Sequence, residues 1–186
     1  MRRPFQRQAL GEREQGGLGA CIVGAVPGAL DRASRLLEEA RTTLEGLHDR
    51  QLLAWALTAQ GLLERAAGRR AAAFDRFEAS IELWRGVGNI FGLACSLVGH
   101  ADVALDEGAS ERALRDLDEA LPLLRRMGNC SGLGDGLRAR ARLAAAEGDR
   151  ESARVFYTEA LELSTRFGDP QAIRECHEAV ARFGKP

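Results

Sequence analysis

One block of sequence occurs three times in this chain, at a constant interval of 40 residues (108 − 68 and 148 − 108). The copies span residues 68–89, 108–129 and 148–169. Each copy begins with glycine, ends in Gly-Asn or Gly-Asp, and has small and apolar residues at the same internal positions. A fixed period of tens of residues is typical of a stacked repeat array, in which no single unit buries its own apolar face. The period therefore restricts the chain to an array of similar units with a core between them.

The repeated unit is predicted to be a hairpin of two helices. Within each copy the apolar residues recur three and four positions apart, as in an amphipathic helix. The segments before the copies align in the same way and predict the first helix of each hairpin, at residues 52–67, 92–107 and 132–147. Small residues recur at one position of these first helices, where packed helix axes come within about 8 to 10 Å, namely at Gly61, Ala101 and Ala141. The fold class is therefore all-α, a right-handed α–α superhelix.

The alignment divides the chain into four parts. These are a loose N-terminal leader (1–18), a partial repeat (19–50), three complete 40-residue repeats (51–169) and a C-terminal capping helix with a tail (170–186). In the partial repeat, Asp31 to Leu47 carries one apolar helical stripe. The stretch 16–28 contains five glycines and Pro27, which disfavour a helix. It is either a degraded first helix of the partial repeat or an irregular cover over the next helix.

The predicted helix ends recur with the same interval. An Asp or Asn precedes each first helix, and the side-chain oxygens of these residues accept the unpaired N–H groups of a helix start. They are Asp49, Asn89, Asn129 and Asp169. Three of them follow a glycine suited to the left-handed conformation that ends a helix. Pro170 takes the first position of the closing helix, where a missing N–H costs nothing.

Two positions depart from the pattern. Pro122 lies inside a second helix and predicts a kink or a lost turn there. His177 stands in the closing helix where Leu137 stands in the preceding repeat. This polar replacement suits a last layer with nothing stacked beyond it.

The repeat resembles the tetratricopeptide repeat. The resemblance rests on a small residue seven positions before a glycine, an alanine five after it, an aromatic residue or leucine four further on, and a small residue three beyond that. The clearest copy is Ala141, Gly148, Ala153, Tyr157 and Ala160. The resemblance covers about residues 31 to 183. Two features depart from the family: the period is 40 rather than about 34, and polar residues occupy a place usually given to Leu, namely Gln60, His100 and Arg140.

The longer unit is similar to extended repeats of bacterial transcriptional activators, peptide-sensing regulators and animal scaffold proteins that bind short motifs. In the resembled family the first helices line a concave groove. Its groove positions fall here on Trp55, Thr58, Leu62, Arg65, Cys95, Val98, Asp102, Leu105, Asp135, Arg138 and Arg142. The groove would have an apolar end, an acidic middle and a basic end. Trp55 is either an exposed anchor for a partner or packs against the partial repeat before it.

Composition argues against several classes of partner. The formal net charge is −1, so no overall basic field favours nucleic acid or an anionic membrane. No run approaches the roughly 20 apolar residues of a membrane span. The start contains two arginines, as a twin-arginine export signal does, but the charged run GEREQ follows where the apolar segment should begin. The four cysteines form no C-x-x-C pair. The sequence therefore predicts a protein of the reducing cytoplasm.

No catalytic, cofactor or metal site is predicted. Cys176 and His177 are adjacent and so face different sides of a helix. His48 and His100 have no carboxylate at a repeated metal-ligand spacing. The glycine run from Gly128 to Gly136 follows a helix and lacks the Lys-Ser/Thr pair of a phosphate loop. We expect it to form a turn and a thin helix start that lets two layers approach closely.

The sequence favours a non-enzymatic interaction module of a regulatory or scaffolding kind. A partner's helix or extended peptide would lie in the groove, with Arg138 and Arg142 pairing with acidic groups and Trp55 and Leu62 contacting apolar ones. One alternative is a self-associating, homodimeric repeat protein. Another is the sensor domain of a transcriptional regulator that binds a small peptide. A third is a catalyst that holds a small molecule or phosphate at the glycine run.

Overall fold

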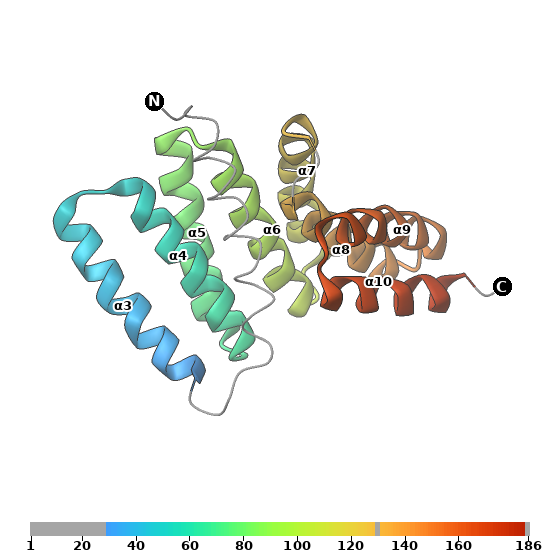
Figure 1. Cartoon of the computed structure of the whole chain (residues 1–186), viewed down its shortest axis with the longest axis horizontal. Helices are drawn as coiled ribbons and strands as arrows, with labels where there is room; N and C mark the ends of the chain where they lie inside the picture. Colours follow the sequence, from blue (N-terminus) through green and yellow to red (C-terminus); the bar gives the residue numbers. More distant parts are fainter. Residues whose placement is uncertain (1–28, 129–130, 185–186) are drawn as a thin grey trace.

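The computed structural model describes residues 29–128 and 131–184, and this part of the chain is all-α (Figure 1). Its eight helices are α3 (Ala29–Leu47), α4 (Arg50–Ala66), α5 (Arg70–Val87), α6 (Ile90–Asp106), α7 (Ser110–Arg126), α8 (Ser131–Ala146), α9 (Arg150–Phe167) and α10 (Pro170–Phe183). The predicted leader lies outside the described residues. The predicted hairpins are confirmed as α4–α5, α6–α7 and α8–α9, with α3 before them and α10 after them.

The helices stack in chain order to form a superhelix. Each helix contacts the next, and α6 also contacts α4 and α8, so the first helices form a continuous row. The direction of the helices changes along the array: α3 to α6 run steeply across the view in Figure 1, whereas α9 and α10 lie nearly horizontal. This rotation between layers is the superhelical twist, and it leaves the first helices on one side of the array.

The turns between helices use left-handed residues at every twentieth position. These residues are Gly68, Gly88, Gly108, Gly128, Gly148 and Gly168, with φ between 72° and 83°, and His48, with φ of 55°. A glycine adopts this conformation without a steric penalty, whereas a side chain such as that of His48 is strained in it. The half-repeat is therefore 20 residues long, and His48 marks the place where the partial repeat keeps the turn without its glycine.

The predicted N-caps are confirmed wherever the structure describes them. Asp49 accepts the N–H of Leu52, Asn89 accepts that of Gly92, and Asp169 caps α10, where Pro170 opens the helix as predicted. Asn129 lies outside the described residues. A further cap, which the alignment did not single out, is Asp149 at the start of α9. Side-chain caps therefore fix the start of α4, α6, α9 and α10.

Small residues do let the helices approach closely. The ring of Phe77 is fully buried, and a Cβ atom at Gly99 would lie 2.4 Å from it and one at Gly61 2.9 Å from it. The same holds in the glycine run, where a Cβ at Gly136 would lie 3.0 Å from a methyl group of Leu121. These distances are too short for any other residue unless the neighbouring side chain moves. The glycines therefore set the spacing between layers.

The lost turn predicted at Pro122 does not occur, because α7 continues through this residue to Arg126. Proline removes the hydrogen bond to the carbonyl four residues earlier, which belongs to Asp118. Both Pro122 and Asp118 are exposed, so water can satisfy the freed carbonyl group. The helix ends at Arg126, one residue before the position at which the equivalent helices α5 and α9 end in their own repeats.

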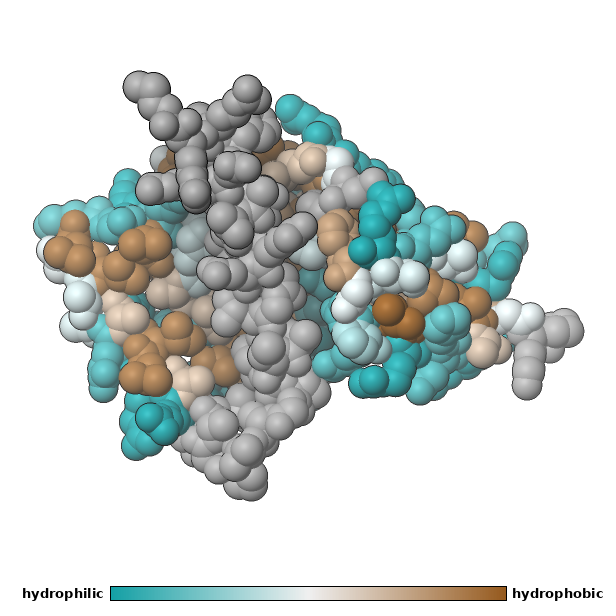
Figure 2. Space-filling model, in the orientation of Figure 1, coloured by the Kyte–Doolittle hydropathy of each residue, from teal (hydrophilic) through white to brown (hydrophobic). Residues whose placement is uncertain are grey.

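The surface is not equally polar along the array. Figure 2 shows hydrophobic residues gathered over α3 and α4, at the end of the array where the described chain begins. Exposed leucines at this end are Leu36, Leu47 and Leu52. None of the described helices combines the length and apolar composition that a membrane crossing requires.

Candidate interaction surface

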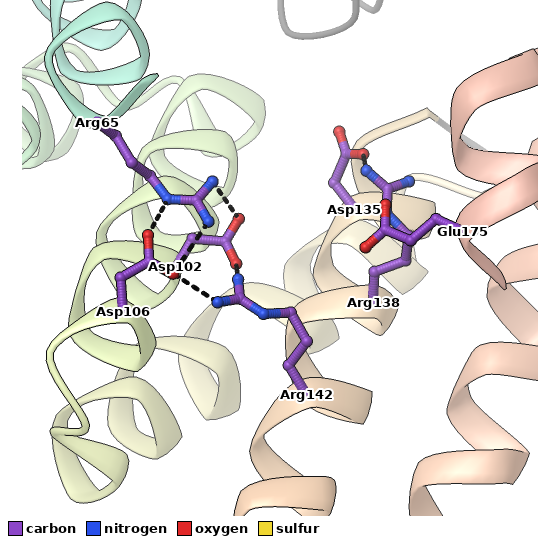
Figure 3. A network of polar contacts seen from close by, with 7 residues as sticks. All are labelled: Arg65, Asp102, Asp106, Asp135, Arg138, Arg142 and Glu175. Carbon is purple, nitrogen blue, oxygen red and sulfur yellow. Dashed lines mark hydrogen bonds and ion pairs between the residues drawn. The ribbon is translucent and has the colours of Figure 1, made fainter. Parts of the chain in front are cut away.

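Three successive first helices are joined by ion pairs between four side chains, Arg65 on α4, Asp102 and Asp106 on α6, and Arg142 on α8 (Figure 3). We call these four residues the charged network. The Nε of Arg65 donates to Asp106 at 2.7 Å, and its Nη1 donates to Asp102 at 3.3 Å. Arg142 donates to Asp106 at 2.6 Å and also to Asp102. Each arginine therefore binds both aspartates.

The repeat itself explains why these side chains meet. Leu62, Asp102 and Arg142 occupy one position of three successive repeats (102 − 62 and 142 − 102, each 40). Stacking places equivalent residues of neighbouring first helices side by side, within reach of an arginine side chain. Asp106 lies one turn after Asp102 on the same face of α6. The charged network therefore forms because the 40-residue repeat aligns α4, α6 and α8 with one another.

A second group of charges lies between α8 and α10. Arg138 approaches Asp135 to 2.8 Å on its own helix and Glu175 on α10 to 3.5 Å (Figure 3). The two carboxylates are about half exposed, at 51% and 48%, whereas Arg138 is more covered, at 21%. These three side chains together carry a net charge of −1. The predicted basic end of the surface is therefore balanced by acidic groups in the folded chain.

Burial and pairing act against each other on the pKa values of the network. Burial raises the pKa of Asp102, while the charges of Arg65 and Arg142 act to lower it. Partial burial also acts to raise the pKa of Asp106, but the hydrogen bond from Arg65 and the charges of both arginines bring this pKa below its ordinary value of 3.8. Asp106 is thus the carboxylate that the network most clearly holds in its ionised form.

Asp106→Asn is expected to remove part of the acid sensitivity of the fold. Because the folded-state pKa lies below the unfolded value of 3.8, ionised Asp106 contributes stability that is present above pH 3.8 and is lost as the pH falls through the folded pKa. The variant should be less stable at neutral pH by about 1 kcal/mol, with a smaller difference in acid. Urea unfolding at both pH values measures this. Asp75→Asn, at an exposed aspartate on α5, is the control; a deficit of equal size at both pH values would contradict the assignment.

The apolar end of the surface is partly covered by its own neighbours. The ring of Trp55 meets that of Trp84 edge to face, with centroids 4.8 Å apart, and lies 6.1 Å from that of Phe91. These rings belong to α5 and α6, which follow Trp55 in the chain. The ring contacts of Trp55 are therefore neither those of a fully exposed anchor nor those of a residue packed against the partial repeat before it. Leu62 and Leu105 are also only partly buried and pack against the core. Trp55, Leu62 and Leu105 therefore combine a packed side with an accessible one.

Two of the predicted groove residues do not reach the surface. Thr58 and Val98 are each only 5% exposed. The hydroxyl of Thr58 lies 2.7 Å from that of Ser80 and 2.9 Å from that of Ser96, inside the core. A partner in the groove would therefore contact few atoms of these two side chains. The other predicted residues, including partly buried Cys95, are at least partly accessible.

Sequence reasoning missed two members of the charged groups, Asp106 and Glu175. Both could have been found from helical spacing: Asp106 lies four residues after Asp102, and Glu175 occupies in α10 the position that Asp135 occupies in α8. The family's groove positions include neither. Their contribution is visible only once the distances between α4, α6, α8 and α10 are known.

The titratable groups elsewhere do not form an activated set among the described residues. Burial raises the pKa of the Cys176 thiol to about 11, so this thiol stays protonated at neutral pH. His100 is 8% exposed, and its Nδ1 lies 2.7 Å from a carboxylate oxygen of Asp116. No group of three or more His, Cys, Asp or Glu side chains in the described ranges could hold a metal ion.

Comparison with known proteins supports the fold. No protein-family model matches the sequence, and no curated protein matches it either. Among solved structures, the chain is similar to the crystal structure of BtubC (BKLC) from P. vanneervenii, with a TM-score of 0.65 and 18% sequence identity, over 98% of this chain and 91% of that one. At this identity the likeness shows the fold alone. It supports a helical repeat array, whereas the tetratricopeptide assignment stays a prediction.

Proposed function

We propose that the chain is a non-enzymatic, tetratricopeptide-like interaction module, regulatory or scaffolding in role, and that its first-helix surface binds a helix or an extended peptide of a partner protein. The observation that carries the proposal is the charged network across α4, α6 and α8. Its side chains remain 22% to 29% exposed and lie on the same helices as the partly accessible Trp55, Leu62 and Leu105. Such a surface offers apolar anchors beside oriented charges.

The charges of this surface suit selectivity more than affinity. Arg142 and Arg138 already bind carboxylates of the same chain. An acidic group of a partner would therefore replace one carboxylate by another, with little net gain in free energy. A basic group of a partner would meet the half-exposed carboxylates of Asp135 and Glu175 but also the arginines beside them, so only a partner whose charges match this pattern would be favoured. Affinity would come mainly from apolar contacts with Trp55 and Leu62.

Affinity capture from native lysate, with partners identified by mass spectrometry, tests the proposal. Trp55→Ala and the double variant Arg138→Ala/Arg142→Ala should each reduce recovery of the same partner, by about tenfold for the tryptophan. Arg125→Ala is a matched control, because Arg125 is 51% exposed and pairs with Glu159 on the second-helix side. Circular dichroism of every variant confirms that it is folded. Recovery that is unchanged in both folded variants would exclude this surface as the binding site.

A further inference from the structure

The first described helix, α3, has the sequence position of a second helix but no first helix before it in the described part of the chain. In α5 the four core-facing residues are completely buried, namely Ala73, Phe77, Ser80 and Trp84. The residues 40 positions earlier carry the same apolar stripe and are each only partly buried, namely Ala33, Leu37, Ala40 and Leu44. The helix therefore keeps a stripe suited to a core, and among the described helices it is α4 that packs against it.

Further apolar side chains extend this stripe into solvent. Leu36 is 57% exposed and Leu47 is 70% exposed. They lie in the region where Figure 2 shows hydrophobic residues gathered over α3 and α4. An exposed apolar patch at the end of a repeat array is the usual sign of a surface that another element covers.

The opposite end of the array is polar. This favours a contact between two α3 helices over head-to-tail stacking of two copies. On α10, Arg174 and His177 are exposed at the positions that Gly134 and Leu137 occupy as buried residues on α8. This end therefore resembles a capping layer. Head-to-tail stacking would bury these polar groups against the leucines of α3, at a cost in desolvation. A contact between two α3 helices avoids that cost and closes on itself around a two-fold axis.

The charges along α3 are arranged for such a contact. Arg32 and Arg35 are exposed in its first turns, and Glu39 is exposed one turn later. None of the three has an ion pair in the described part of the chain. In an antiparallel pair of α3 helices with the axis near Leu37, Arg35 of each copy would lie opposite Glu39 of the other. Leu36 of each copy, which shares the exposed face of α3 with these charges, would lie beside these pairs.

We propose that the exposed face of α3 binds a second copy of this chain in an antiparallel, two-fold symmetric dimer. This inference is independent of the proposed groove, which lies on the first helices. Contact between two single helices buries little area, so the dimer is expected to be reversible and to depend on protein concentration.

Sedimentation equilibrium over a wide range of protein concentration tests the proposal. The average mass is expected to rise with concentration toward that of two chains. Leu36→Glu should weaken dimerisation at least about tenfold, because it places a charge between the two helices. Val155→Glu is the matched control, since Val155 is 50% exposed on α9, and it should dimerise as the parent protein does.

A charge exchange separates contact between copies from effects within one helix. Arg35→Glu alone and Glu39→Arg alone should each lose the dimer, because like charges would face each other across the axis. An equal mixture of the two variants should regain it as a heterodimer. No interaction within one chain can be restored by mixing, so recovery on mixing supports the interface.

Two results would overturn the proposal. One is a parent protein that stays monomeric at every concentration. A loss of stability in Leu36→Glu would then indicate that residues 1–28 of the same chain cover α3. The other is a dimer that Leu36→Glu leaves intact, since its interface would then lie elsewhere.

Discussion

Replacing Phe77 by alanine is expected to lower the free energy of unfolding by about 3 to 5 kcal/mol. The ring is completely buried and packs against backbone positions on two first helices, Gly61 and Gly99. Neither glycine has a side chain that could move into the space left by the ring. The cavity would therefore stay open, and cavities that cannot collapse are the most costly. Chemical unfolding followed by far-UV circular dichroism measures the loss.

Phe167→Ala is the matched control for this prediction. Phe167 ends the equivalent helix of a later repeat, α9, and is 46% exposed. Its removal takes away little buried surface and should cost less than about 1 kcal/mol. If the two variants unfolded at the same denaturant concentration, the close packing of Phe77 between the two glycines would not hold the layers together as described.

The position of Phe77 could be predicted from the sequence because a repeat constrains each position several times. Phe77, Leu117 and Tyr157 align at one position of the second helices, and all three are buried. The caps and turns are equally repetitive, and local backbone chemistry fixes them without help from distant residues. For these reasons the helix order and boundaries in the described ranges were predictable within a few residues.

The candidate surface was less predictable because it depends on contacts between repeats. The family's groove register includes Thr58 and Val98, yet both are buried here. A helix position says which way a side chain points but not how close the neighbouring helix lies. Likewise Asp102 and Arg142 were expected at a partner-binding groove, but the ion pair that joins them in the folded chain was not predicted. Pairing between helices depends on the distances between them, which one sequence does not state.

Thr58 shows what a predicted surface residue does when it is buried. Its hydroxyl, with those of Ser80 and Ser96, joins three helices, α4, α5 and α6. It donates to the carbonyl of Ala54 and accepts the indole N–H of Trp84 at 3.4 Å. Buried polar groups are stable only when such partners are present. The cluster therefore fixes how the first hairpin docks on the next.

Thr58→Val is accordingly expected to destabilise the fold by about 1 to 3 kcal/mol, although it preserves the shape of the side chain. The change leaves the fully buried indole N–H of Trp84 without its acceptor. Thermal and urea unfolding measure the loss. In a Ser96→Ala background the same change should cost less than in the parent protein, because the two hydroxyls share one network.

Thr165→Val supplies the comparison that isolates burial. Thr165 also donates to the carbonyl four residues earlier, at 2.8 Å, but it is exposed. Water can replace its hydroxyl, so its loss should change stability by less than about 0.5 kcal/mol. Equal effects at Thr58 and Thr165 would mean that the buried hydroxyls contribute only to their own helices. The hydroxyl of Thr58 would then not be what joins α4 to α5 and α6.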